Sequence, residues 1–153
     1  MESFKTKYNI PPHMGVKYVA QVEWFNERKT GEVVILMIAF IEGGMTIPMG
    51  VLIRNFLRFF KLPPTQCAPN IFKVLGSTEA LNERMNLNLT HHDVNWIYNL
   101  HNMKGQGYYL KSMNLAVRLI QCLPISNKGL KHDFLFFLGN GMTVYLIQLR
   151  RVY

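Results

Sequence analysis

The stretch from Ile47 to Asn70 constrains the fold of this chain more than any other part of the sequence. Over Met49–Phe60 the apolar residues follow the spacing of one helical face, and Pro48 stands near the first turn, where its missing N–H does no harm. The pair Pro63-Pro64 ends this helix, because each proline disfavours helical geometry in the residue before it. A second helix is expected from Asn70 to about Glu83. The sequence therefore predicts two helices joined by a proline-framed break.

Two neighbouring segments complete the predicted helical part. The run Val33–Glu42 fits a buried strand or a buried helix by its periodicity, and its β-branched start favours a strand locally. The pair Gly43-Gly44 after it is a suitable stop for a helix, since glycine tolerates the left-handed conformation. Further on, Thr90 is a suitable N-cap with Asp93 in the third helical position. This spacing predicts a capping box and a helix that runs to about Met103.

The pattern changes to that of strands after Gly105. Short apolar or aromatic segments alternate there with glycine, proline and asparagine, and Asn140-Gly141 is a good hairpin turn. The predicted strands are Tyr108–Leu110, Val117–Cys122, Phe134–Leu138 and Val144–Leu149. Helices first and strands afterwards indicate an α+β domain, in which three to four helices are followed by short antiparallel hairpins packed on them.

Residues 1–30 differ in composition from the rest of the chain. They mix Pro11-Pro12 and Gly15 with scattered charges and a few apolar residues, which is typical of a loosely ordered arm with short extended pieces docked on the core. We therefore expect an N-terminal arm over residues 1–30 and a single α+β domain over residues 31–153. A chain of 153 residues is long enough to bury a core of its own.

The balance of charges narrows the classes of partner. Lysine and arginine outnumber acidic residues by 17 to 9, a net charge of +8, so polyanions are the first partners to consider. Cys67 and Cys122 make neither a disulfide framework nor the Cys/His spacing of a zinc knuckle. The longest apolar run, Val33–Ile41, is far short of the roughly 20 residues of a membrane span, and the first residues lack the apolar region of a secretory signal. We expect an intracellular protein, nuclear or cytoplasmic, with no membrane partner.

A search for catalytic constellations finds little that an enzyme could use. Asp93 and Asp133 are the only aspartates, and both follow histidine, as His91-His92-Asp93 and His132-Asp133. Either group could serve as a metal ligand set or as an acid–base pair. As an alternative, His91-His92-Asp93 forms the first turn of a capped helix, and His132-Asp133 forms a polar edge before an aromatic strand. No phosphate-binding glycine loop, Gly-x-Ser-x-Gly elbow or carboxylate triad of a transposase is recognisable. The prediction is a protein that is not an enzyme, with no catalytic residue, metal, cofactor or small-molecule substrate.

Basic and aromatic residues are interleaved in the last third of the chain. Phosphate contacts combined with base stacking need such a mixture, so these residues form the candidate nucleic-acid site. The basic candidates are Lys104, Lys111, Arg118, Lys128, Lys131, Arg150 and Arg151, and the stacking candidates are Tyr108 and Tyr109. The turn Ser126–Gly129 adds small polar residues and an ammonium group that could approach a phosphate. An ordinary solvated face explains the same charges, and that alternative stays open.

A second hypothesis is a protein-interaction or oligomerisation module. The helix predicted over Met49–Phe60 is rich in aromatic residues, and the later part of the chain adds methionines. These are Met85, Met103, Met113 and Met142. An aromatic and methionine surface suits a second subunit or a partner helix, whereas burial of the same side chains in the core is the alternative.

The helix–break–helix stretch also resembles a known family. An Ile-Pro step, the apolar helix positions and a Leu-x-Pro-x-Gln-x-x-Pro-Asn element are carried by Ile47, Pro48, Ile53, Arg54, Phe56, Leu57, Phe60, Leu62, Pro64, Gln66, Pro69 and Asn70. Two further pieces, Tyr8–Pro11 and Leu123–Lys131, stand in the expected order. On these residues the chain resembles the gypsy-type plant transposon domain, a retroelement-associated family, from Tyr8 to Leu138.

The resemblance implies an origin more than an activity. It favours a helix over Val33–Glu42 and a transposon-derived, non-enzymatic domain that associates with nucleic acid, with itself or with another retroelement protein. Related proteins continue beyond the aromatic strand, so we expect this chain to be truncated at its C-terminus relative to the family, or to be an inactive relic fragment. Leu130 stands where the family commonly has tryptophan, which weakens the packing expected of that turn.

Overall fold

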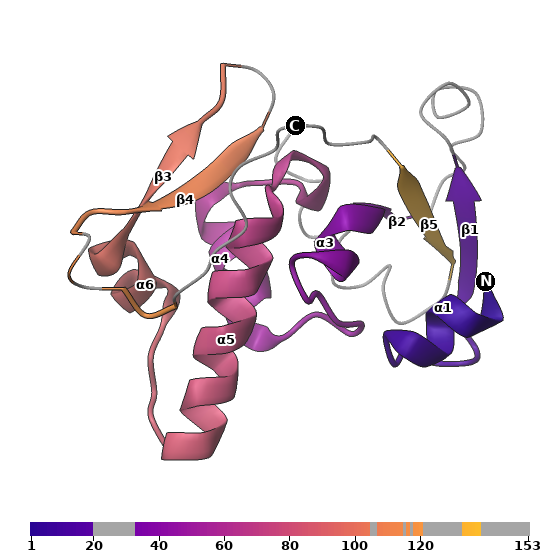
Figure 1. Ribbon diagram of the computed structural model, residues 1–153, viewed down its shortest axis with the longest axis horizontal. Helices are drawn as coiled ribbons and strands as arrows, with labels where there is room; N and C mark the ends of the chain where they lie inside the picture. The colour runs from indigo at the N-terminus through magenta and orange to yellow at the C-terminus, as the bar shows by residue number, and fades with distance from the viewer. Residues whose placement is uncertain (20–32, 105–106, 115, 117, 121–132, 139–153) are drawn as a thin grey trace.

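The computed structural model describes residues 1–19, 33–104, 107–114, 116, 118–120 and 133–138. The α+β class and the antiparallel strands predicted from the sequence are confirmed. The helices are α1 (Glu2–Lys7), α3 (Met37–Ile41), α4 (Val51–Phe60), the 3₁₀ turn η1 (Pro64–Gln66), α5 (Pro69–Met85) and α6 (His91–Ile97). The strands are β1 (Gly15–Val19), β2 (Val33–Leu36), β3 (Tyr98–Asn102), β4 (Tyr108–Ser112) and β5 (Phe134–Leu138). Figure 1 shows α5 in the middle, with the β3–β4 hairpin on one side of it and the sheet containing β1 and β5 on the other.

The three-stranded sheet is built around the aromatic strand β5. Its order is β1-β5-β2, and both neighbours pair with β5 in the antiparallel sense. Side chains alternate along a strand, so Leu135 and Phe137 join the main core, whereas Phe134 and Phe136 join a second apolar cluster with Val34. An apolar run buried on both faces belongs in the centre of a sheet, which is where β5 lies.

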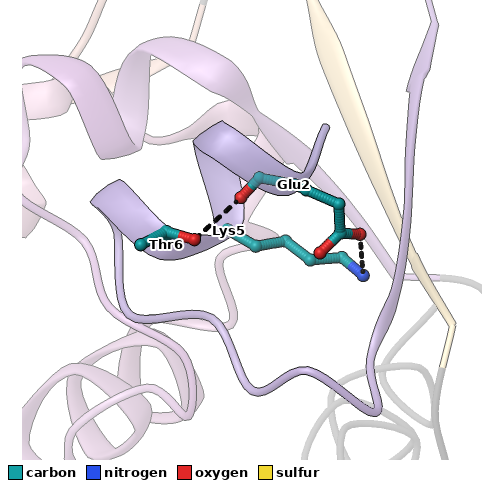
Figure 2. A network of polar contacts seen from close by, with 3 residues as sticks. All are labelled: Glu2, Lys5 and Thr6. Carbon is teal, nitrogen blue, oxygen red and sulfur yellow. Dashed lines mark hydrogen bonds and ion pairs between the residues drawn. The ribbon is translucent and has the colours of Figure 1, made fainter.

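The first residues of the chain take part in this sheet. β1 pairs with β5, with Gly15 opposite Leu138 and Val19 opposite Phe134. Before it, α1 is tied locally by an ion pair between Lys5 and Glu2 at 3.1 Å and by the hydroxyl of Thr6, which donates to the Glu2 carbonyl (Figure 2). The apolar residues between these two elements, Ile10 and Met14, are buried in the main core. Residues 20–30 of the expected arm lie outside the described residues.

The helix–break–helix stretch forms as its residue pattern predicts, except that α4 begins at Val51, so Pro48 precedes the helix instead of lying in its first turn. α4 and α5 pack together through apolar residues that are all buried: Leu52, Ile53, Phe56 and Leu57 from α4, and Ile71, Phe72, Val74 and Leu75 from α5. The N-terminus of α4 follows Gly50, and the carboxylate of Glu79 on α5 accepts a hydrogen bond from the Leu52 N–H at 3.2 Å. A negative group at a helix N-terminus satisfies a free donor and complements the helix dipole. This contact therefore fixes one helix against the other.

Two predictions in the helical part of the chain require correction. The segment Val33–Glu42 is neither all strand nor all helix, because β2 ends at Leu36 and α3 begins at Met37. The helix capped by Thr90 ends at Ile97 instead of reaching Met103, because residues 98–102 pair with β4 and alternate between the core and the surface. Pairing with a partner strand thus overrode the local propensity.

The remaining strand predictions have mixed outcomes. β4 and β5 appear where the composition predicts strands. Residues 118–120, within the predicted strand Val117–Cys122, are not in a strand. The predicted strand Val144–Leu149 and the turn Asn140-Gly141 lie outside the described residues.

The β3–β4 hairpin is attached to α5 by a buried asparagine. The side-chain amide of Asn70 donates to the Leu110 carbonyl at 2.7 Å, and its oxygen accepts the Leu110 N–H at 3.2 Å. Next to it, the Ala68 N–H donates to the Tyr108 carbonyl at 2.8 Å, and Cys67 forms a parallel bridge with Tyr108. The side-chain amide of Asn70 thus makes the two hydrogen bonds to the edge of β4 that a neighbouring strand would make. Later in the same helix, Asn82 makes the same pair of bonds with Leu89, at 2.8 and 2.9 Å.

We expect Asn70→Ala to lower the free energy of unfolding by about 2–4 kcal/mol, because it leaves the N–H and carbonyl of Leu110 buried without partners. Asn82→Ala removes the same pair of bonds where water can replace them, so its cost should be about 1 kcal/mol. Asn55→Ala, on the exposed face of α4, is the matched control and should change stability by less than about 0.5 kcal/mol. Urea unfolding of the three variants measures this order, and equal costs for Asn70 and Asn82 would contradict it.

Candidate nucleic-acid interface

The β3–β4 hairpin has one face in the core and one in solvent. In an antiparallel pair, residues opposite each other point to the same side of the sheet. The core side carries the pairs Tyr98–Ser112, Leu100–Leu110 and Asn102–Tyr108, and the solvent side carries the pairs Asn99–Lys111 and His101–Tyr109. Burial agrees with this division away from the turn, since Tyr98 and Leu110 are buried whereas Asn99 and Lys111 are exposed; Asn102, next to the turn, is exposed as well. We call the four residues Asn99, His101, Tyr109 and Lys111 the hairpin face.

The hairpin face combines rings with a positive charge. The rings of His101 and Tyr109 are in contact, with centroids 5.5 Å apart and planes inclined by 32°. Lys111 is two residues after Tyr109 on the same side of β4, and Asn99 lies across from it. Such a surface offers a flat π-system, an ammonium group and an amide, which are the groups that contact bases and phosphates.

Lys104 stands at the closed end of the hairpin. It is exposed in the turn between β3 and β4, with φ of 49°. The Met103 N–H donates to the Gly107 carbonyl at 2.8 Å, and Gly107 itself has φ of 115°. A Cβ atom on Gly107 would meet the Gln66 carbonyl oxygen at 2.6 Å, so the turn requires glycine and lies directly against η1. The position of Lys104 is therefore set by backbone contacts.

Arg118 stands near the open end of the hairpin. It is exposed, and two residues later the Ile120 N–H donates to the hydroxyl of the buried Tyr98, at 3.2 Å. Because Tyr98 begins β3, this bond holds the segment of Arg118 beside the start of the hairpin. Five-residue strands rise by about 3.4 Å per residue. Lys104 thus lies at the closed end of the hairpin, and Lys111 and Arg118 lie towards its open end.

The other predicted basic residues are not part of the described structure. Lys128, Lys131, Arg150 and Arg151 lie outside the described residues, as does the turn Ser126–Gly129. The two predicted stacking residues lie on opposite sides of the hairpin. Tyr109 is on the hairpin face, whereas Tyr108 packs against the main core. Consecutive residues of a strand point to opposite sides, which is why the two tyrosines separate.

The sequence around the hairpin contains hardly any negative charge. No aspartate or glutamate occurs between Asp93 and Asp133, and none occurs after Asp133. The carboxylate of Asp133 accepts a hydrogen bond from the Tyr18 hydroxyl at 2.9 Å, on the three-stranded sheet across the molecule from the hairpin (Figure 1). A surface with one sign of charge attracts polyanions over a distance of about 8–10 Å at physiological salt.

The candidate metal or acid–base residues His91, His92 and Asp93 form the first turn of α6, where Asp93 takes part in the helix cap. The carboxylate of Asp93 accepts the Thr90 N–H and the Thr90 hydroxyl, both at 2.7 Å, so the predicted capping box is present. The rings of His91 and His92 lie 4.1 Å apart and pack against Phe59. Burial, and then the neighbouring imidazole of His92, lower the pKa of His91, against a smaller opposing effect of Asp93. His132 lies outside the described residues.

Within the described part of the chain, no group of three histidine, cysteine, aspartate or glutamate side chains is arranged to hold a metal ion. Cys67 is 1% exposed, and burial raises the pKa of its thiol, so the thiolate form is disfavoured there. The described helices include none that is long and apolar enough to cross a membrane.

Sequence reasoning missed two residues of the hairpin face and Trp96, the most exposed large apolar side chain among the described residues. Asn99 and His101 were assigned to a helix, although the segment Tyr98–His101 alternates apolar and polar residues, which is the period of a strand. Trp96 was not singled out, yet its side chain is 79% exposed on α6. The capping box starts this short helix but does not mark its end, so the sequence lacked a local stop before the strand.

Comparison of the chain with models of protein families, with curated proteins and with solved structures found no match.

The capping box should give the stability a dependence on pH. The hydrogen bonds from the hydroxyl and N–H of Thr90 hold the pKa of Asp93 below its ordinary value of 3.8. Because the folded state has the lower pKa, the stabilisation is present above the ordinary value and is lost as pH falls through the folded value. We expect the urea midpoint of Asp93→Asn to decline less than that of the wild type from about pH 5 to pH 2.

Thr90→Val is the control for this experiment, because it removes the hydroxyl partner and keeps the carboxylate. Its pH profile should lie between those of the wild type and Asp93→Asn. Three parallel profiles would show that the capping bonds do not set the titration of Asp93.

Proposed function

We propose that this protein binds nucleic acid through the hairpin face and performs no catalysis itself. The observation that carries the proposal is the contact of the His101 and Tyr109 rings beside the exposed Lys111. Rings supply stacking and ammonium groups supply phosphate contacts, and neither depends on base sequence. The protein would therefore bind with little sequence preference and with strong dependence on salt.

The surrounding charges support a polyanion as the ligand. Lys104 and Arg118 are exposed near the two ends of the hairpin, and the chain has no acidic residue between Asp93 and Asp133. Phosphates along a strand are spaced closely enough to contact more than one of these cations, since DNA carries a charge about every 3.4 Å per strand. Each contact releases counterions, which gives binding a measurable salt slope.

We also propose, from the resemblance of Ile47–Asn70 and the pieces at Tyr8–Pro11 and Leu123–Lys131, that the domain is transposon-derived. A nuclear or cytoplasmic location follows from a nucleic-acid ligand. Asn70 carries part of the resemblance and also has a structural role, because its side chain is hydrogen-bonded to β4, the strand that contains Tyr109 and Lys111.

A protein-interaction or oligomerisation module is the second candidate. Several apolar side chains are exposed, among them Phe59, Met85, Trp96 and Met113. Clusters of exposed apolar side chains are typical of contacts with other chains, including copies of the same chain or another retroelement protein. An inactive relic would have neither activity.

We expect Lys111→Gln and Lys104→Gln each to reduce the slope of log affinity against log salt by about 1, because each removes one phosphate contact. Fluorescence anisotropy of a labelled oligonucleotide between about 50 and 200 mM salt measures the slope. Lys7→Gln is the matched control, since Lys7 is exposed on α1, on the far side of the molecule from the hairpin (Figure 1). An equal reduction in all three variants would indicate attraction by net charge alone and would remove the hairpin face as the site.

The two tyrosines should give opposite results. Tyr109→Ala should weaken binding about tenfold with an unchanged unfolding midpoint, because it removes an outward-facing ring. Tyr108→Ala should lower the free energy of unfolding by about 2–4 kcal/mol, because its ring packs against the core. Anisotropy and urea unfolding of both variants measure the difference. Unchanged affinity of Tyr109→Ala would count against stacking on this face.

A further inference from the structure

Trp96 is the largest apolar side chain left in water among the described residues. Its side chain is 79% exposed, although tryptophan is on average a highly buried residue. Its neighbour Val94 fills the core position of α6, so Trp96 does not serve the packing of the helix. An exposed indole of this kind is available to a ligand that offers a flat apolar surface.

Trp96 belongs to a row of rings on α6 and α4. His92 and Trp96 are four residues apart on α6 and are therefore neighbours on the helix surface. The His92 ring contacts the ring of Phe59 with centroids 5.1 Å apart, and the His91 ring contacts it at 5.0 Å. Phe59 is itself 51% exposed. We call Phe59, His91, His92 and Trp96 the α6 ring row.

The α6 ring row and the hairpin face are adjacent along the chain. α6 ends at Ile97 and β3 begins at Tyr98, with no connecting loop. The Met113 N–H donates to the Ile97 carbonyl at 3.0 Å, which fixes the end of β4 against the end of α6. Trp96 is thus only three residues before Asn99 of the hairpin face. One extended ligand could contact both surfaces.

The charges next to the α6 ring row favour an anionic ligand. Arg58 on α4 and Lys61, the residue that follows the helix, flank Phe59 and are exposed. The one acidic side chain on α6, Asp93, is directed at Thr90, from which it accepts two hydrogen bonds. Rings bordered by cations are the combination that binds unpaired nucleotides, because every base has a π-face and every linkage a phosphate.

We propose that Trp96 and the α6 ring row stack on unpaired bases and give the protein a preference for single-stranded over double-stranded nucleic acid. This inference rests on the proposed function of the hairpin face. In a duplex the bases are already stacked on one another, so an indole gains nothing from them. In a single strand the bases are free to stack on Trp96, while phosphates contact the nearby cations.

The test compares Trp96→Ala with the wild type on a labelled oligothymidine of roughly 12 nucleotides and on a duplex of the same length. We expect a loss of roughly tenfold in single-strand affinity, unchanged duplex affinity and an unchanged salt slope, because a stack but no phosphate contact is removed. Trp96→Phe should retain most of the single-strand affinity. Single-strand binding should also quench an emission component that Trp96→Phe lacks.

Met85→Ala is the matched control, because Met85 is 64% exposed at the C-terminal end of α5. It should bind both ligands as the wild type does. Urea unfolding of every variant verifies that the fold is retained, as expected for substitutions of exposed side chains.

The outcomes separate this inference from the proposed function. If Lys104→Gln and Lys111→Gln reduce the salt slope but Trp96→Ala binds single strands as tightly as the wild type, the hairpin face stands and the α6 ring row is excluded. If the wild type binds neither ligand at about 50 mM salt, both are overturned. If Trp96→Ala only converts a sedimenting dimer to a monomer, the row contacts a second copy of the chain and the inference is wrong.

Discussion

The pair of hydrogen bonds between Asn70 and Leu110 is the interaction on which the candidate interface depends. A two-stranded hairpin is at best marginally stable on its own, and β4 has only β3 as a strand partner among the described residues. The Asn70 amide, in a side chain that is 5% exposed, supplies the donor and acceptor that a third strand would supply. Because a buried amide without these bonds would be costly, the helix and the hairpin stabilise each other.

The same register sets both the stability and the proposed chemistry of the hairpin. Tyr98 and Leu110 enter the core because they alternate with residues on the other side of the hairpin, where Asn99 and Lys111 are exposed and His101 and Tyr109 are half-buried. A slip by one residue would exchange the two faces and bury Lys111, at a high cost in desolvation. Gly107 helps to prevent such a slip, since its backbone lies against Gln66 and has a conformation that other residues rarely adopt. The register that buries Tyr98 and Leu110 therefore also sets the side on which the rings of His101 and Tyr109 lie.

Local chemistry allowed much of this fold to be predicted. The α4–break–α5 unit, the Thr90 capping box and the aromatic strand β5 follow from apolar spacing, proline stereochemistry and side-chain capping, which act within a few residues. Val33–Glu42 could not be divided in advance, because a continuous apolar run satisfies a buried strand and a buried helix equally. The end of α6 was missed for a related reason: residues 98–102 became a strand only through pairing with β4.

The sequence by itself determined the α+β class, the positive charge of the last third and the residues available to bind a polyanion. Only the tertiary structure decided which of them share a surface. It directed Tyr109 outward and Tyr108 inward, joined His101 to Tyr109, and left Trp96 in solvent on the helix whose His92 ring contacts Phe59. Charge and helix capping are properties of residues and their near neighbours, whereas the facing of a side chain depends on a partner strand or helix that is distant in sequence.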